Sequence, residues 1–92
     1  MTKGERNGEA SGLADGIETK LERRYGLGSK PDSRRAFYRR LRMAVEIHGE
    51  RAWIAIRTVA AEADGARLPE RYFCRTALAR LRESGLMPMA DL

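Results

Sequence analysis

The chain has 92 residues, 42% of them hydrophobic, and a net charge of +5, so we expect one small folded domain that favours anionic partners. A single cysteine, Cys74, and a single histidine, His48, exclude an intrachain disulfide and a Cys/His metal site, and no cofactor is predicted. No segment approaches the roughly 18 apolar residues of a membrane span and no signal peptide is evident, so we expect a cytoplasmic protein without a membrane partner.

The N-terminal residues 1–11 are polar and contain glycine, which predicts a disordered tail followed by one helical domain at residues 12–92. An i, i+4 spacing then predicts a first helix whose apolar stripe comprises Leu13, Ile17, Leu21 and Tyr25. Gly26, Gly28 and the pair Lys30-Pro31 mark the end of this helix.

A second helix is predicted to begin at an N-cap formed by Asp32 or Ser33 and to end at Gly49. Its apolar face comprises Phe37, Leu41, Ala44, Val45 and His48. A different face carries Arg35, Arg39 and Arg42. His48 is interpreted as a group that complements the C-terminal end of the helix dipole.

Two apolar residues of the second helix, Met43 and Ile47, lie off its main apolar face. They indicate either a second contact surface, such as a dimer seam or a partner site, or a patch that the first helix covers.

A third helix is predicted from about Glu50 to Asp64, before Gly65. One side of it carries Trp53, Ile56, Ala60 and Ala63, and the stripe is widened by Ala52, Ile54 and Val59. We interpret Trp53 as an anchor of the core.

The fourth helix, from about Pro69 to Ser84, shows the sharpest division between its faces. Its apolar side chains span an arc of about 140° at 100° per residue, and they are Phe73, Cys74, Ala77, Leu78 and Leu81. We therefore interpret Cys74 as a buried, inert thiol. A separate stripe carries Arg71, Arg75 and Arg82, with Tyr72 and Thr76 beside it. Because no segment alternates with period two, the predicted fold class is all-α, with four helices.

The charge is distributed unevenly along the chain. Residues 1–32 contain six basic and six acidic side chains, whereas residues 33–92 contain twelve arginines, no lysine and seven carboxylates. The whole net charge therefore lies on the second part. An arginine-rich helical surface favours phosphate or guanine recognition, although coding by GC-rich DNA also explains a preference for arginine over lysine.

The run RTALARLRESGLM contains an Ala-Leu-x-x-Leu-x-x-x-Gly-Leu-hydrophobic pattern, formed by Ala77, Leu78, Leu81, Gly85, Leu86 and Met87. This pattern resembles the end of the recognition helix in winged helix-turn-helix regulators. Upstream, the run VAAEADG resembles their bracing helix, with Ala60 or Ala61 allowing a close helix crossing and Gly65 making the turn. The resemblance covers approximately residues 50–87 and implies a helix-turn-helix domain.

The chain departs from this family at two points. The turn from Gly65 to Pro69 is longer than the commonest form by about three residues. Seven residues follow Gly85, which is too few for a wing hairpin, so we expect a wingless variant.

The resemblance implies a set of residues that face DNA. Its groove-facing positions fall on Arg71, Tyr72, Arg75 and Thr76. Arg71 or Arg75 is suited to guanine O6 and N7. The residues predicted to contact phosphate are Arg82, Arg35, Arg39 and Arg42.

The predicted function is therefore that of a small basic protein, a transcriptional regulator that inserts helix 69–84 into the major groove of double-stranded DNA. A homodimer or a larger protein partner is expected, because a monomer of this size covers few base pairs. The alternative is a helical adaptor that binds a protein through the same basic helix or through Met43 and Ile47. RNA binding is a weaker third option. No catalytic constellation is recognisable, so no enzyme activity is predicted.

Overall fold

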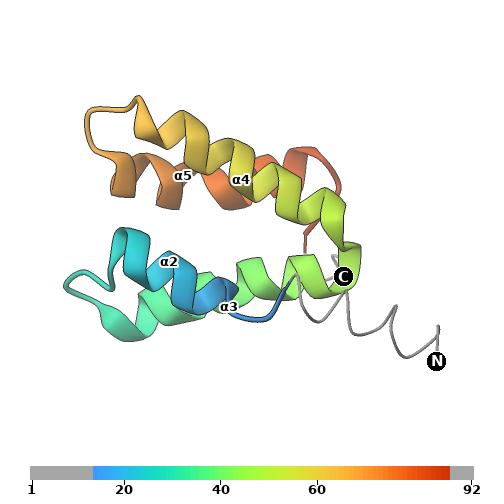
Figure 1. Ribbon diagram of the computed structural model, residues 1–92, viewed down its shortest axis with the longest axis horizontal. Helices are drawn as coiled ribbons and strands as arrows, with labels where there is room; N and C mark the ends of the chain where they lie inside the picture. The colour runs from blue at the N-terminus through green and yellow to red at the C-terminus, as the bar shows by residue number, and fades with distance from the viewer. Residues whose placement is uncertain (1–13, 88–92) are drawn as a thin grey trace.

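The computed structural model describes residues 14–87, so the predicted tail at residues 1–11 and the start of the predicted first stripe, Leu13, lie outside the described residues. Four helices follow one another, namely α2 (Ile17–Tyr25), α3 (Pro31–His48), α4 (Glu50–Asp64) and α5 (Pro69–Glu83) (Figure 1). The described part of the chain contains no strand. The predicted all-α class with four helices is confirmed. None of the described helices is both long and apolar enough to cross a membrane.

Proline and glycine set the ends of the helices. Helix α3 begins at Pro31, one residue before the predicted cap, and no side chain caps its N-terminus. Proline suits this position because its fixed φ matches the helix and its missing N–H would have no intrahelical partner there. Gly49 separates α3 from α4 with a φ of +68°, which glycine adopts at little cost. Its N–H donates to Val45 O at 2.7 Å.

The helices form two antiparallel pairs, with α2 beside α3 and α4 beside α5 (Figure 1). Helix α4 packs extensively on both α3 and α5. At the far end of the second pair, His48 Nε2 lies 2.8 Å from Met87 O, so the chain after α5 returns to the junction of α3 and α4. Helices α4 and α5 thus form an αα-hairpin, whereas the helices of a helix-turn-helix meet at about 90–120°.

Aromatic rings join the two helix pairs in the core. Tyr25 of α2 stacks on Phe73 of α5 with a centroid distance of 4.5 Å, and Phe37 of α3 meets the same ring edge-on at 6.1 Å. Tyr38 is fully buried, and its hydroxyl donates to Gly26 O at 2.7 Å. Offset and edge-to-face contacts of this kind add to the hydrophobic contribution of ring burial.

The inward face of α3 differs from the prediction. Tyr38 lies at its centre with Leu41, Ala44 and Val45, while Phe37 is only partly buried at its edge. The reason is that Tyr38 finds a hydrogen-bond partner in the turn after α2, which allows its polar hydroxyl to be buried.

The inward face of α4 is also rotated relative to the prediction. Its buried residues are Ala52, Ile56, Val59 and Ala63. Trp53 is half-buried at the edge of the core and Ile54 is 53% exposed, so neither is the core residue that was predicted. The alanines allow the neighbouring helix backbones to approach closely, and the bulky indole then lies to one side.

Candidate nucleic-acid interface

Helix α5 separates an inward apolar face from an outward basic one. Phe73, Ala77 and Leu81 are its buried residues. Arg71, Arg75 and Arg82 are exposed, and none of them forms an ion pair with a residue among 14–87. With Arg67 of the preceding turn, which is also exposed, these three arginines are called the α5 arginine face. The predicted exposure of Arg71, Arg75 and Arg82 is confirmed.

A shallow hollow of about 350 Å³ lies at the N-terminal end of this face. It is lined by Ala66, Arg67, Leu68, Arg71, Tyr72 and Arg75. Three of the six residues carry a positive charge and none is acidic. No side chain caps the first turn of α5, so the positive end of its dipole adds to the same field. The hollow can therefore attract an anionic group.

The carboxylate nearest to this hollow in sequence, Glu70, is engaged elsewhere. Its Oε2 lies 2.7 Å from Arg34 Nη1 of α3. The same guanidinium nitrogen is 3.4 Å from the hydroxyl of Tyr38 and 3.3 Å from Gly26 O. The pKa of Arg34 is raised, first by its hydrogen bond to Tyr38 and then by Glu70. Arg34 thus neutralises the acidic group in the first turn of α5.

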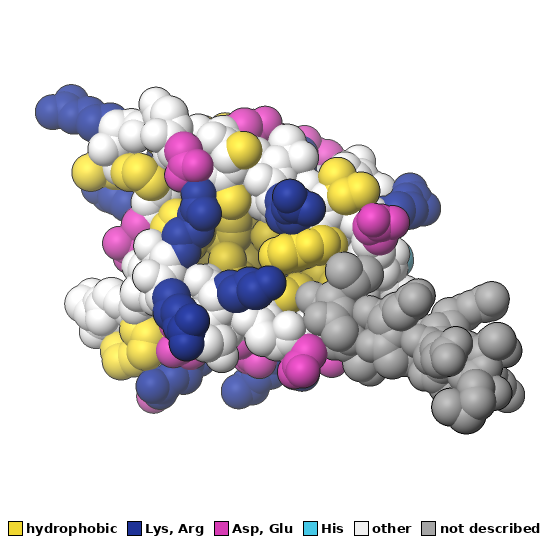
Figure 2. Space-filling view, in the orientation of Figure 1, with side chains coloured by type: hydrophobic (Ala, Val, Ile, Leu, Met, Phe, Trp, Pro, Cys, Tyr) yellow, Lys and Arg dark blue, Asp and Glu magenta, His cyan; other side chains and the backbone are white. Residues whose placement is uncertain are grey.

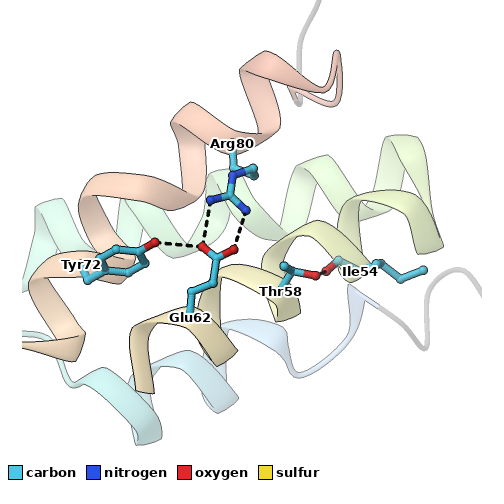
Figure 3. A network of polar contacts seen from close by, with 5 residues as sticks. All are labelled: Ile54, Thr58, Glu62, Tyr72 and Arg80. Atoms are coloured by element: carbon cyan, nitrogen blue, oxygen red, sulfur yellow. Dashed lines mark hydrogen bonds and ion pairs between the residues drawn. The ribbon is translucent and has the colours of Figure 1, made fainter. Parts of the chain in front are cut away.

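Tyr72 does not have the outward orientation that the resemblance implied. It packs against the core, and its hydroxyl donates to Glu62 Oε1 of α4 at 2.9 Å (Figure 3). Thr76 is half-buried. A helix has only one outward face, and in α5 Arg71 and Arg75 occupy it, so Tyr72 lies toward α4. Tyr72 also lines the hollow beside Arg71 and Arg75, and its contact with the DNA groove stays a prediction.

Glu62 is the centre of a network that joins α4 to α5 (Figure 3). Arg80 donates to both of its oxygens, at 2.8 and 3.1 Å. These hydrogen bonds, with a smaller contribution from Tyr72, lower the pKa of the Glu62 carboxyl. The bond to Glu62 raises the pKa of the Tyr72 hydroxyl. One turn or more toward the start of α4, Thr58 donates to Ile54 O at 2.8 Å.

The predicted phosphate contacts on α3 fall into two groups. Arg42 is about one-third exposed, and its guanidinium lies 3.3 Å from Glu18 of α2 and 3.2 Å from Glu46. Arg35 and Arg39 are exposed, with Arg35 only 3.8 Å from Asp32. Arg42 therefore takes part in ion pairs with two carboxylates, and its phosphate contact stays a prediction.

The arginine stripe of α3 is not brought to the α5 arginine face. Helix α3 meets α5 through Arg34 and Phe37, whereas Arg42 points toward α2. Arg35 and Arg39 share the side of α3 that carries Arg42, by helical spacing. The arginine stripe of α3 and the α5 arginine face are therefore separate surfaces, although the sequence analysis predicted that both contact DNA.

Sequence reasoning missed two arginines that form ion pairs between helices. Arg34 and Arg80 bind carboxylates of other helices, Glu70 and Glu62. Nothing in the sequence distinguishes Arg34 from its neighbour Arg35, because the choice depends on which residue faces α5. For Arg80 a signal was available, because helical spacing on α5 places it beside the buried residues Ala77 and Leu81.

Four other predicted residues have clear positions. Cys74 is half-buried rather than fully buried, and partial desolvation raises the pKa of its thiol. Ile47 is 57% exposed at the end of α3, while Met43 is half-buried. His48 is half-buried and bonded to Met87 O.

Comparisons with protein-family models, curated proteins and solved structures found no match to this chain. The assignment to helix-turn-helix regulators therefore stays a prediction.

Proposed function

We propose that the protein binds double-stranded DNA through the α5 arginine face. The single observation that carries this proposal is the hollow bordered by Arg67, Arg71 and Arg75, which has no carboxylate in its lining. Unpaired guanidinium groups bind phosphate oxygens and guanine edges with two parallel hydrogen bonds. Among the described residues, ion pairs hold Arg24, Arg34, Arg42 and Arg80, whereas the arginines of this face form none and keep their charge for a partner.

An α-helix fits the major groove, which is about 12 Å wide. Arg71 and Arg75 are one turn apart, or about 6 Å along the axis, and so can reach neighbouring base pairs. Arg82 lies about two turns beyond Arg75 on the same face and is suited to the phosphate backbone, as is Arg67 in the turn before α5. In this proposal α5 is the recognition helix and α4 packs against it.

A role as a transcriptional regulator is part of the same proposal. Specific recognition by one short helix covers few base pairs, which favours a dimer on a two-fold site or recruitment by a larger protein. The antiparallel αα-hairpin means that the proposal depends on the exposed arginines of α5 and not on the crossing angle of a helix-turn-helix.

The experiment compares two variants that lose the same charge. A preferred duplex is first selected from a random pool with the 92-residue protein. We expect Arg71→Ala/Arg75→Ala to weaken binding to that duplex by about thirtyfold or more, because each lost base contact costs about 1–3 kcal/mol. The matched control is Arg23→Ala/Arg51→Ala, which removes two exposed arginines from α2 and α4.

Circular dichroism should show that both double variants keep their helices. An equal loss of affinity in the two variants would show that only net charge matters. If the selection yields no preferred duplex, Arg71 and Arg75 do not recognise the base sequence.

A further inference from the structure

A groove lies between α2 and α4, and it shares no residue with the α5 arginine face. Its volume is about 550 Å³. Helix α2 packs mainly on α3, and α4 packs on α3 and α5, so a depression remains between α2 and α4. Figure 2 shows hydrophobic side chains in this depression, with Lys and Arg side chains around them. The residues that line it are Lys20, Leu21, Arg23, Arg24, Trp53, Ile56, Arg57, Ala60, Ala61 and Asp64.

The floor of the groove is apolar. Leu21 and Ile56 form its deepest part and belong to the core, and the small side chains of Ala60 and Ala61 leave space above them. Trp53 is half-buried and presents its indole to the groove. Such a surface gains free energy when apolar side chains cover it.

The rim of the groove is basic. It carries four basic side chains and one carboxylate, Asp64, which leaves a net charge of +3. Asp64 Oδ1 is held by Arg24 Nη2 at 2.6 Å. Two cations also lie over the Trp53 ring, with Lys20 Nζ 5.8 Å and the Arg57 guanidinium carbon 6.0 Å from its centroid. The cations therefore stand directly beside the apolar floor.

We propose that this groove binds an acidic amphipathic helix of a partner protein. The apolar face of that helix would cover Trp53 and the floor, and its Asp and Glu side chains would meet Lys20, Arg23 and Arg57 on the rim. Helix α2, which forms one wall, has nine residues and is about 14 Å long, so the site matches two to three turns of a partner helix. This is the helix-in-groove mode of recognition.

The positive charge of the rim disfavours binding of a second copy of this chain, or of its own N-terminal residues, in the groove. Helices α2, α3 and α5 each carry a net positive charge, and in α4 the carboxylates Glu62 and Asp64 are already paired with Arg80 and Arg24. A second copy would thus bring like charges to the rim. Residues 1–13 contain two basic and two acidic side chains, so they offer no negative charge to match it.

The inference does not depend on DNA binding, because the two surfaces have no residue in common. The probe is a fluorescent acidic peptide of about 15 residues with leucine on one face and glutamate elsewhere. Two matched peptides accompany it, one with the glutamates replaced by lysine and one with the same residues scrambled. Binding to the 92-residue protein is followed by peptide anisotropy and by the emission of Trp53, the only tryptophan.

We expect the acidic amphipathic peptide to bind with a Kd below about 100 μM and both matched peptides to bind at least about tenfold more weakly. The variants Arg57→Glu and Ala61→Glu, both at exposed positions, should each weaken binding by about tenfold. Arg51→Glu lies on the same helix outside the groove and should leave the Kd unchanged within about twofold.

Equal binding of the acidic and lysine peptides would overturn the proposal, as would binding that is insensitive to Arg57→Glu and Ala61→Glu. A Kd weaker than about 100 μM for the acidic peptide would overturn it as well. A single-stranded oligothymidylate that binds more tightly than the peptide and changes the emission of Trp53 would assign the groove to base stacking instead.

Discussion

Tyr38 shows how one buried polar atom can decide which face of a helix turns inward. Its ring is fully buried, and its hydroxyl donates to Gly26 O and accepts a longer hydrogen bond from Arg34. Burial, which is only partly offset by Arg34, raises the pKa of this hydroxyl. The neutral form is therefore the one that the fold accommodates.

We expect Tyr38→Phe to lower the free energy of unfolding by about 0.5–1.5 kcal/mol, because it removes one hydrogen bond and keeps the ring. Urea unfolding at neutral pH measures the loss. The matched control is Tyr25→Phe, whose hydroxyl instead accepts a hydrogen bond from the exposed Arg24 side chain. A Tyr38→Phe protein as stable as the wild type would show that the Gly26 contact contributes nothing.

At the scale of the helices, the sequence was sufficient to predict most helix ends to within one or two residues. Glycine at residues 26, 49, 65 and 85 and proline at 31 and 69 lie within two residues of helix ends. These signals are local, since they depend on the φ preferences of single residues. The exposed stripe of Arg71, Arg75 and Arg82 was predictable for a similar reason, because it depends only on helical spacing.

The orientation of α3 and α4 was not predictable to the same degree. Phe37 and Tyr38 are only 100° apart around α3, and the turn that bonds Tyr38 comes from another element. Trp53 was expected in the core because of its size, yet it lies at the edge of the groove between α2 and α4. Such positions depend on contacts between helices, and these contacts cannot be inferred from a single sequence.

Glu62 connects α4 to α5, and its protonation should loosen that connection. Because Arg80 and Tyr72 lower the pKa of Glu62 in the folded state, the carboxylate stabilises the fold above its unfolded pKa of about 4.5. That contribution is lost as the pH falls through the folded pKa. We therefore expect Glu62→Gln to be less stable than wild type at neutral pH and to show a shallower loss of stability in acid.

The measurement is the urea midpoint of unfolding followed from neutral pH to about pH 3. The control is Glu50→Gln, an exposed carboxylate at the start of α4 that has no ion-pair partner among the described residues. If Glu62→Gln and wild type lose stability in parallel over this range, the network in Figure 3 does not couple to pH.

At the scale of the whole molecule, the α5 arginine face and the groove between α2 and α4 are separate basic surfaces. Internal ion pairs hold Arg24, Arg34, Arg42 and Arg80. The remaining charge includes the α5 arginine face and the rim of the groove between α2 and α4. A protein that binds DNA through the α5 arginine face and an acidic helix through the groove would bring these two partners together.

The central claim is that the α5 arginine face contacts DNA, and a salt titration tests it most directly. Anisotropy of a labelled random duplex gives the binding constant at each salt concentration. On a random duplex, which offers no preferred base contacts, we expect Arg71 and Arg75 to bind phosphates as Arg67 and Arg82 do. Four such contacts predict a slope of log K against log salt of about −3 to −4. The slope of Arg71→Ala/Arg75→Ala should be shallower by about 2, whereas Arg23→Ala/Arg51→Ala should keep the wild-type slope. Undetectable duplex binding at low salt, or the same slope in wild type and Arg71→Ala/Arg75→Ala, would contradict the account.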